Sequence, residues 1–476
     1  MATRPTPVYR TADIRRIEAA AGNVEPSLME RAALAASDLA VVLASERGKD
    51  ILVLAGPGNN GGDARITARI LTERFFRVTM VTATEATTLP VGKTWALIID
   101  GLFGTGLTRD IVGNYARIVD YANAQPCRVL ALDIPSGLAS DTGRVLGTAV
   151  RATHTLTFIA QKPGLLTLDG PDLSGEVRIA DLGLDLQSLF PPTGWIAGPE
   201  LLPHSLKTRP RNFHKGSAGS VAIVGGAAGM CGAALLAGRA ALKLGAGKVF
   251  VGLLDHEAPG FDPGALELML RRPDEVLGLD LDALVIGPGL GEGERAETLL
   301  GAALSSEIAC VLDADALNLL AVNGDLQRAC ARRSAHTVIT PHPAEAARLL
   351  NTSTREVQAD RMAAAHLLSE RFNAHTVLKG NGSILAARDG HWFINTSGNP
   401  GMATAGMGDV LSGILGAMLA QGLSGEAAMV LGTHLHGAAA DECVSRSIGP
   451  VGLTASEVAD AARHVWNAWL IPKMVS

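Results

Sequence analysis

The sequence has 476 residues, of which 47% are hydrophobic and 18% are charged, and its formal net charge is −6. This composition is typical of a well-buried globular protein of two domains, and the acidic balance gives no field that would hold nucleic acid or an anionic membrane surface. The five cysteines are scattered without CxxC spacing, which argues against a disulfide framework and a zinc site and favours a reducing compartment.

The N-terminal segment, residues 1–20, has no apolar stretch of signal-peptide length, and the most apolar segment, residues 410–420, is too short to span a bilayer. We therefore expect a soluble cytoplasmic protein with no membrane partner. Short apolar runs alternate with helical patterns through the first half. The expected strands lie at residues 51–56, 77–83, 95–101, 128–137, 154–160 and 176–184. Several are continuously apolar, as strands covered on both faces are, which predicts a doubly wound α/β sheet.

A glycine-rich segment, GPGNNGGDAR at residues 56–65, follows the first expected strand. Its glycines permit positive φ angles and a close approach of the backbone to a ligand, and Asn59, Asn60 and Asp63 add amide and carboxylate oxygens. The segment matches neither GxGxxG nor GxxxxGK[ST], so it does not indicate a conventional dinucleotide fold or a P-loop. The alternative interpretation is a tight turn without a ligand.

Two further strand ends carry polar groups. The segment IIDGLFGTGLTRD (98–110) contains Asp100, and ALDIPSG (131–137) contains Asp133 and Ser136. The carboxyl ends of parallel strands lie along one edge of a sheet, so we expect these groups to lie together. Oxygen atoms of Asn60, Asp100 and Ser136 could enclose a hard monovalent or divalent cation. The remaining groups would then face an organic ligand.

Near residue 205 the pattern lapses into a proline- and glycine-rich stretch, which predicts a boundary between domains at 1–205 and 206–476. The alternation of strands and helices then resumes. The expected strand segments are 220–226, 248–255, 283–291, 310–318, 337–346 and 376–387. A second doubly wound α/β domain follows from this pattern.

The segment NTSGNPGMATAGMGDVLSG (395–413) is polar and glycine-rich up to Asp409, after which the apolar spacing predicts a buried helix that begins within TAGMGD. Asp409 is well placed to accept a proton from a hydroxyl that attacks a phosphoryl group, and its alternative role is that of a helix N-cap. The backbone N–H groups expected to form an anion hole there are those of Ala405, Gly406, Met407 and Gly408.

Three histidines and a lysine complete the candidates in the second half. His342 lies between two prolines after an expected strand, where a ligand contact is plausible. His434 and His436 have i, i+2 spacing, which points them apart on a helix and disfavours a metal site. Lys379 stands beside Gly380 and could meet a phosphate, although alone it would be a solvated strand-end lysine.

The motifs GPGNNGGD, DGLFGTGL and DIPSG, in this order, resemble the NAD(P)H-hydrate epimerase domain, a Rossmann-like three-layer sandwich. The resemblance implies a K+ site on Asn60, Asp100 and Ser136. We expect Asp133 to give or accept a proton at the ring, and the alternative is that this strand-end aspartate only binds a ribose or loop amides. Where relatives usually have glycine after GNNGGD, this chain has Ala64. The implied substrate-binding positions are Asn59, Asn60, Gly61, Gly62, Asp63, Gly104, Thr105, Gly106, Leu107, Thr108, Arg109, Asp110 and Asp133.

The GMGD segment resembles the ribokinase-like α/β/α superfamily. Together with GPGLG (287–291), DADALN (313–318), TPHPAEAARLL (340–350) and VLKGNGS (377–383), it is similar to ADP-dependent (S)-NAD(P)H-hydrate dehydratase. The resemblance implies substrate contacts at Ala233, Gly289, His342 and Asp409. It implies nucleotide contacts at Lys379, Gly380, Asn381, Gly382, Ser383 and Gly408.

Both domains on one chain suggest sequential work on one metabolite. The resemblance implies that the first domain interconverts the epimers of NAD(P)HX, and that the second dehydrates the S form with ADP, accompanied by Mg2+, as phosphoryl donor and Asp409 as base. Domains of this type commonly assemble, so we expect a homo-oligomer that binds small molecules and no nucleic acid. The alternative is a ribokinase-like small-molecule kinase fused to a non-catalytic ligand- or RNA-binding module.

Overall fold

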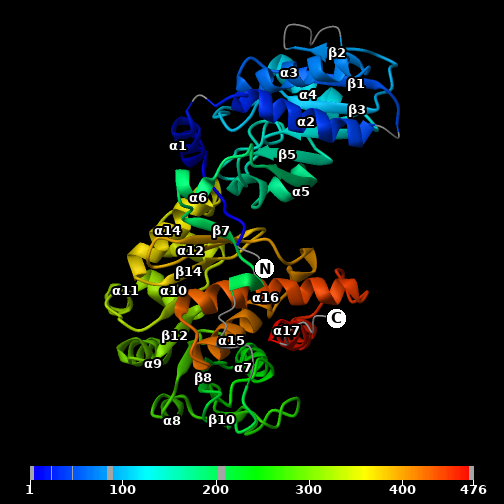
Figure 1. Cartoon of the computed structure of the whole chain (residues 1–476). Coiled ribbons are helices and arrows are strands. Elements are labelled where there is room, and N and C mark those ends of the chain that lie inside the picture. Colours follow the sequence, from blue (N-terminus) through cyan, green and yellow to red (C-terminus); the bar gives the residue numbers. More distant parts are fainter. Residues whose placement is uncertain (1–4, 23, 45–46, 83–88, 202–208, 471–476) are drawn as a thin grey trace. The chain divides into compact units, whose positions relative to one another are not determined.

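The computed structural model describes residues 5–22, 24–44, 47–82, 89–201 and 209–470 (Figure 1). The chain forms two compact units, one at Thr6–Trp195 and the other from Ile196 onward. The predicted boundary at residues 205–206 lies outside the described residues. Among these residues, no helix is both long and apolar enough to cross a bilayer.

The first unit is built on a six-stranded sheet in which all strand pairs are parallel. Its strands, in the order β2-β1-β3-β4-β5-β6, confirm the six predicted segments, except that residue 83 lies outside the described part. The bounds are β1 (Asp50–Ala55), β2 (Arg77–Val81), β3 (Leu97–Gly101), β4 (Arg128–Leu132), β5 (His154–Phe158) and β6 (Glu176–Ala180).

Helices cover both faces of this sheet because successive side chains of its strands point to opposite sides. In β1, Ile51 and Val53 join one core cluster with residues of α2 (Leu28–Ala44) and α3 (Asn59–Glu73). Leu52 and Leu54 join the other cluster with residues of α4 (Gly113–Asn123). The first unit is therefore the predicted doubly wound sandwich. Its remaining helices are α1 (Thr11–Ala21), α5 (Gly170–Ser174) and α6 (Leu186–Leu189).

The second unit contains a ten-stranded sheet in the order β10-β9-β8-β11-β12-β13-β14-β15-β16-β7. The pairs from β10 to β14 are parallel, and the pairs β14-β15 and β15-β16 are antiparallel. The bounds are β7 (Gly194–Ile196), β8 (Ser220–Gly225), β9 (Lys248–Leu253), β10 (Met269–Arg271), β11 (Ala283–Ile286), β12 (Ala309–Leu312), β13 (Thr337–Ile339), β14 (His375–Leu378), β15 (Ser383–Ala386) and β16 (Trp392–Asn395).

Each predicted segment of the second half contains a strand, with two differences. Residues 376–387 form two strands, β14 and β15, because the KGNGS turn reverses the chain between them. The strands β7, β10 and β16, with three or four residues each, were not predicted. Other strands of that length, such as β13, lie within longer predicted segments.

The longest helices of the second unit include α15 (Met407–Ala420), α16 (Gly425–Ser445) and α17 (Ala455–Leu470) (Figure 1). α15 is buried on almost every side, and the predicted core residues Val410, Leu411, Ile414, Leu415 and Met418 are all buried. The other helices are α7 (Cys231–Lys243), α8 (Pro273–Leu277), α9 (Glu294–Ser305), α10 (Asp315–Val322), α11 (Gly324–Ala331), α12 (Pro343–Leu350), α13 (Thr354–Ala359) and α14 (Arg361–Phe372).

Two glycines let α15 lie between a helix and the sheet. A Cβ on Gly413 would stand 2.1 Å from the carbonyl oxygen of Ala237 in α7. A Cβ on Gly416 would stand 2.4 Å from a methyl group of Val285 in β11. Both distances are below van der Waals contact, so any larger side chain at these positions would push α15 away from its neighbours.

In each sheet the strand order reverses between two neighbouring parallel strands. The reversal lies between β1 and β3 in the first unit, and between β8 and β11 in the second. Connections run to opposite faces at such a point, which leaves a crevice outside the carboxyl ends of the strands, where open α/β sheets bind ligands. The glycine-rich segments that follow β1 and β11 lie at these two points.

Candidate active sites

The first glycine-rich segment is mostly helix. Only residues 56–58 form a turn, and Asn59 to Asp63 make up the first turn of α3 with Gly58 as N-cap. A Cβ on Gly56 would meet the carbonyl oxygen of Leu102 at 1.7 Å, and one on Gly61 would meet the carbonyl oxygen of Gly56 at 1.9 Å. Glycine is therefore required where the β1 and β3 ends touch. This contact brings the polar start of α3 to the carboxyl end of β3.

The three predicted cation ligands are buried side chains. Ser136 donates hydrogen bonds from its N–H to Asp100 Oδ2 at 2.8 Å and from its Oγ to Asp100 Oδ1 at 2.7 Å. Asp100 is fully buried, and burial raises its pKa to about 6 although the Ser136 and Leu102 hydrogen bonds oppose that shift. Asn60 donates from Nδ2 to the carbonyl oxygen of Leu132, but its buried Oδ1 accepts no hydrogen bond.

An orphaned amide oxygen near a buried carboxylate fits a cation. Gly104 shows how close the parts lie, because a Cβ on Gly104 would stand 3.3 Å from the side chain of Asn60 and 3.5 Å from Asp133 Oδ2. Gly101, next to Asp100, is equally close to Asn60: a Cβ there would stand 2.9 Å from the Asn60 carbonyl oxygen. A buried acceptor without a donor is unfavourable unless an ion or water satisfies it. The donor set is all oxygen, as hard cations prefer.

Asp133 forms a buried ion pair that the sequence analysis did not include. Asp133 Oδ1 accepts hydrogen bonds from the Lys162 ammonium group and, at 3.3 Å, from the Phe158 N–H. Lys162 is fully buried and also donates to Thr157 Oγ1 at 2.8 Å and to the Phe158 carbonyl oxygen at 2.7 Å. Asp133 has a φ of +68°, which is rare outside glycine and asparagine. The other carboxylate oxygen, Oδ2, is the one beside Gly104.

Asp63 is a second acid of this region, at the end of the first turn of α3. Burial raises its pKa to about 7, and the nearby carboxylates of Asp133 and Glu18 add to the shift. A carboxyl group with that pKa is protonated for about half of the time at neutral pH and can give or take a proton. Asp63 and the Asp133–Lys162 pair are the ionisable groups that lie together in this region.

Seven of the other predicted residues of the first site lie on one loop. The loop from Gly104 to Asp110 connects β3 to α4, and Gly106, Thr108, Arg109 and Asp110 are exposed. The side chain of Ala64, the residue that departs from the usual glycine, points into the core. Its side chain is buried in the core cluster, and its Cβ lies 2.5 Å from the point that a Cβ on Gly101 would occupy. The extra methyl group is thus packed against the sheet.

In the second unit, Asp409 is the third residue of α15 and does not cap it. The N-cap is Gly406, with a φ of +86°, and no side chain accepts a capping hydrogen bond there. The amides at the helix start are therefore those of Met407, Gly408 and Asp409. They share Met407 and Gly408 with the predicted run 405–408. Burial raises the pKa of Asp409 to about 6, with a further contribution from Asp313 that Lys379 opposes.

Asp313 organises this helix start and was not predicted as a site residue. It is 1% exposed, accepts a hydrogen bond from Lys379 Nζ at 3.0 Å through Oδ1, and accepts one from Ser412 Oγ at 2.7 Å through Oδ2. A Cβ on Gly408 would stand 3.4 Å from Lys379 Nζ and 3.5 Å from Asp313 Oδ2. The space beside Gly408 is thus bordered by an ammonium group and a carboxylate.

Lys379 is not the solvated lysine of the alternative interpretation. Its side chain is 23% exposed, and its Nζ is also 3.9 Å from Glu345 Oε2. Burial opposes the charge, but the carboxylates of Asp313 and Glu345 outweigh it and raise the pKa of Lys379. The ammonium group therefore stays charged at neutral pH, as a phosphate contact requires.

The turn that follows Lys379 is held from behind by a buried arginine. Arg361, in α14, donates to the carbonyl oxygens of Asn381 at 2.6 Å and Leu378 at 3.2 Å. Gly380 has a φ of +146°, and a Cβ there would stand 2.6 Å from Arg361 Nη2. The N–H of Gly380 donates to Ser383 Oγ at 3.2 Å. The KGNGS turn is therefore a rigid hairpin connection.

The predicted substrate contacts fall into two groups. Ala233 and Gly289 are neighbours, since a Cβ on Gly289 would lie 3.4 Å from the Ala233 Cβ. His342 is the N-cap of α12, where its Nδ1 accepts from the Ala344 N–H at 3.1 Å and its own N–H donates to Glu345 Oε2 at 2.7 Å. Burial lowers the pKa of His342, and the charge of Lys379 lowers it further.

His434 and His436 lie on α16 in different surroundings. The His434 ring stacks on Trp469 with a centroid distance of 5.5 Å, and its Nδ1 is 3.2 Å from Asn395 Oδ1. His436 is buried, and burial lowers its pKa to about 4 with help from the charge of Lys379. The two rings therefore share no common partner among the described residues.

Comparison with known protein families gives two matches along the chain. Residues 221–463 match the family model described as NAD(P)H-hydrate dehydratase. Residues 25–93 and 82–164 match the model described as YjeF-related protein N-terminus. The two matches fall in the two structural units.

Individual relatives extend over both units. The chain is 37% identical over 506 residues to the bifunctional NAD(P)H-hydrate repair enzyme Nnr of Escherichia coli (strain K12), and the match covers 97% of this chain and 94% of the relative. It is 46% identical over 270 residues to the ADP-dependent (S)-NAD(P)H-hydrate dehydratase of Neisseria meningitidis serogroup B, covering 56% of this chain and 90% of the relative.

Among solved structures, the second unit is similar to the ADP/ATP-dependent NAD(P)H-hydrate dehydratase of Bacillus subtilis co-crystallized with ATP/Mg2+. The TM-score is 0.50 at 29% sequence identity, and the match covers 55% of this chain and 94% of that chain. The similarity agrees with the predicted ribokinase-like fold of the second half.

Proposed function

This chain belongs to the family of bifunctional NAD(P)H-hydrate repair enzymes, and from this premise we propose how its residues perform the two reactions. The enzyme epimerises (R)- and (S)-NAD(P)HX and dehydrates the S form to NAD(P)H in an ADP-dependent step. The relatives' names give no support to the alternative of a small-molecule kinase fused to a non-catalytic module.

For dehydration, we propose that Asp409 takes the proton of the substrate hydroxyl while that oxygen attacks the terminal phosphoryl group of ADP. Hydroxide is a poor leaving group, whereas phosphate departs readily with help from the lone pair of the ring nitrogen. The bonds formed are O–P and then C5=C6, the bonds broken are P–O of ADP, C6–O and C5–H, the C5 proton passes to solvent, and the products are AMP, phosphate and NAD(P)H. The pKa of about 6 leaves Asp409 ionised at neutral pH.

The transferring phosphoryl group is held at the start of α15. Its outward N–H groups, which include the predicted Met407 and Gly408, and the helix dipole favour negative charge there. Lys379 adds a charged donor beside Gly408, and the KGNGS turn from Gly380 to Ser383 holds the nucleotide. Ala405 and Gly406, which precede the helix, complete the proposed anion hole. Mg2+ enters with ADP as part of the nucleotide complex and neutralises its phosphates.

The observation that carries this assignment is the convergence of Asp409, Asp313 and Lys379 around Gly408. Asp409, whose pKa is raised, lies in the first turn of α15, which has no side-chain cap. The Lys379 ammonium group lies beside Gly408 of the same turn. Of the predicted substrate contacts, His342 lies in the field of Lys379, and Ala233 and Gly289 line the strand-order reversal. These positions suit the nicotinamide ring and the attached ribose.

For epimerisation, we propose that Asp133 and Asp63 exchange protons with the C6 hydroxyl and with water. Protonation of the hydroxyl lets it leave with the ring nitrogen lone pair, and water then returns to either face of C6. Lys162 fixes Asp133 through Oδ1 and leaves Oδ2 toward Gly104. The predicted substrate-binding residues of α3 and of the loop 104–110 border the same space.

K+ would be held by Asn60 Oδ1, Asp100 and Ser136, which fit it as an all-oxygen set with one orphaned acceptor. When bound, the ion neutralises the buried Asp100 carboxylate and fixes the β1 and β3 ends. We propose a cytoplasmic homo-oligomer that acts on NAD(P)HX and ADP, without a nucleic acid or a membrane as partner.

One assay tests the two assignments together. The purified chain is given mixed-epimer NADHX with ADP, and restored NADH is followed by its absorbance. The Asp409→Asn variant should restore no NADH yet still interconvert the epimers. The Asp133→Asn variant should restore NADH from the S epimer only. Full repair by Asp409→Asn, or unaltered R-to-S exchange by Asp133→Asn, removes the corresponding residue from the chemistry. A stable phosphorylated product would revive the kinase alternative.

A further inference from the structure

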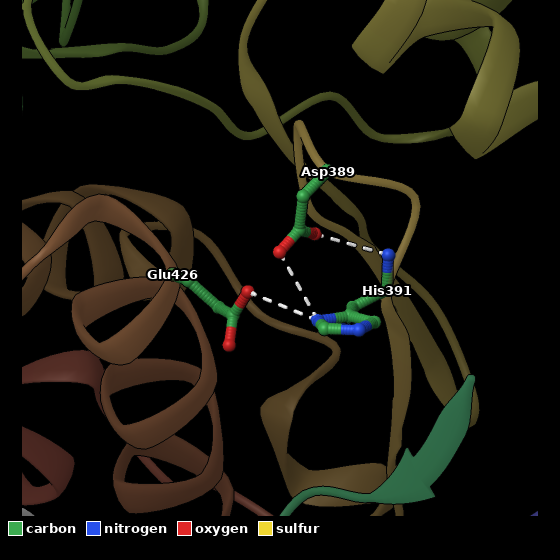
Figure 2. A group of neighbouring side chains, drawn as sticks. All are labelled: Asp389, His391 and Glu426. Carbon is green, nitrogen blue, oxygen red and sulfur yellow. Dashed lines mark hydrogen bonds and ion pairs between the residues drawn. The ribbon is translucent and has the colours of Figure 1, made fainter. Parts of the chain in front are cut away.

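Three potential metal ligands meet where the β15–β16 turn approaches the first turn of α16 (Figure 2). Asp389 and His391 flank Gly390 at the tip of the turn, and Glu426 is the second residue of α16. One ligand atom of each residue lies within 4.8 Å of those of the other two. Among the described residues, no other group of three or more His, Cys, Asp or Glu side chains meets this condition.

The imidazole nitrogen Nδ1 of His391 is the centre of the group. It lies 3.1 Å from Asp389 Oδ2 and 3.9 Å from Glu426 Oε2. Figure 2 shows both carboxylates pointing toward this nitrogen from opposite elements. The N–H of His391 donates to Asp389 Oδ1 at 3.1 Å, and Gly390 has a φ of +91°. The turn therefore fixes the relative positions of the first two ligands before any ion arrives.

The charge balance of the group favours a cation. Two carboxylates face one imidazole, with Asp389 Oδ2 and Glu426 Oε2 at 3.1 Å and 3.9 Å from His391 Nδ1. The side chains are 56%, 45% and 34% exposed for Asp389, His391 and Glu426, so an ion can enter from solvent without a conformational change. A divalent ion would relieve the repulsion between the two acids.

We propose that Asp389, His391 and Glu426 bind one divalent transition-metal ion, for which Zn2+ is the reference. Imidazole nitrogen selects Zn2+, Ni2+ or Co2+ over Mg2+ and Ca2+, which prefer all-oxygen sites. Tetrahedral Zn2+ with bonds of about 2.1 Å separates its ligand atoms by about 3.4 Å. The Asp389–His391 distance of 3.1 Å is slightly shorter than this spacing and the Glu426–His391 distance of 3.9 Å is slightly longer, so small side-chain rotations bring both to it. Water fills the fourth position.

The consequence of binding is a cross-link between the hairpin and α16. Asp389 and His391 belong to the β15–β16 connection, and Glu426 belongs to the helix, 35 positions after His391 in the sequence. An ion that binds only the folded chain stabilises it by RT ln(1 + [Zn2+]/Kd). The site contains none of the residues assigned above to dehydration or epimerisation.

The test uses the untagged full chain, freed of metals by a chelator and kept without nucleotide, titrated with Zn2+ by calorimetry. We expect one ion per chain at this site, a rise in melting temperature with Zn2+, and an affinity about ten-fold or more lower in both His391→Ala and Glu426→Gln. The matched control is His464→Ala, which removes an exposed histidine of α17. It should bind Zn2+ as the unaltered chain does.

Crystals soaked in Zn2+ give an independent readout. An anomalous peak within bonding distance of His391 Nδ1 and both carboxylates supports the site. Zn2+ affinity that is the same in His391→Ala and Glu426→Gln as in the unaltered chain overturns it, as does a peak confined to other histidines. Because the titration contains neither ADP nor NADHX, failure here leaves the assigned reactions untouched.

Discussion

Lys379 Nζ donates a 3.0 Å hydrogen bond to Asp313 Oδ1, which joins two residues 66 positions apart beside the first turn of α15. The same carboxylate also holds Ser412 of that helix through Oδ2. Asp313 therefore fixes both Lys379, which we propose contacts the nucleotide, and the helix start that carries Asp409. The pair acts as a positioning device for both.

Replacing Asp313 by Asn should therefore impair dehydration without touching the reacting atoms. Removing one member of a buried pair leaves the other charge unmatched, and the expected loss of stability is about 3 kcal/mol. We expect a higher KM for ADP with little change in epimerisation, measured by coupled assays on single epimers. The surface control is Asp325→Asn, whose carboxylate is 88% exposed. An unchanged KM for ADP would contradict the positioning role.

Dehydration should depend on the ionisation of Asp409. A general base must be unprotonated, and its pKa is raised to about 6, so the rate should be level above pH 7 and fall as the pH drops through 6. At pH 5 we expect kcat/KM for the S epimer to be about ten-fold below the plateau. An unperturbed aspartate would keep the plateau down to about pH 5. A rate that stays level to pH 5 rejects Asp409 as the titrating base.

Variants of the Lys162–Asp133 pair can separate effects on the stability of the chain from effects on the rate of epimerisation. Lys162→Met should slow R-to-S exchange by about 100-fold or more and destabilise the chain by about 3 kcal/mol, because Asp133 keeps a charge in a buried setting. The double variant Lys162→Met with Asp133→Leu should recover most of the stability but none of the exchange. Exchange measured by chromatography of the epimers, beside thermal unfolding, decides the case. Normal exchange in Lys162→Met would show that the lysine is only structural.

Removal of potassium should destabilise the first unit. The orphaned Asn60 Oδ1 represents an unfavourable term of about 1–3 kcal/mol unless an ion satisfies it. Replacing K+ by tetramethylammonium should therefore lower the melting temperature of the unaltered chain. The response should vanish in Asn60→Ala and persist in Asn123→Ala, which removes an amide bonded to Ala149 and Arg151 in the same unit. A potassium response that survives in Asn60→Ala would exclude that residue as a ligand.

The sequence predicts the architecture of both halves because the parallel strands are continuous apolar runs. The placement of groups at strand ends follows from the same pattern, and it correctly locates Asp100, Asp133 and Ser136 at one edge of the first sheet. The same rule applies to Asp313, which follows β12, and to Lys162, which follows β5, yet neither was singled out. Asp313 lies inside the DADALN motif, which was noted only for the resemblance, and Lys162 lies in none of the motifs described above.

Other features have no signal in a single sequence. The pairing of Lys379 with Asp313 depends on the order β12-β13-β14, which brings the ends of distant strands together. The helical state of residues 59–63 depends on the backbone contact between Gly56 and Leu102. Glycine-rich stretches favour turns by local propensity, so only the packing of the two strand ends reveals that a helix begins there.

The glycines of α15 have a consequence for how this chain can diverge. Gly413 lets α15 pack closely against the backbone of α7, and Gly416 lets it contact β11. The position of its first turn therefore does not depend on the bulky side chains nearby. Substitutions among those surrounding residues should therefore not move the proposed phosphoryl site. Related enzymes could thus change the residues around the site to accept another damaged metabolite while the proposed nucleotide site keeps its position.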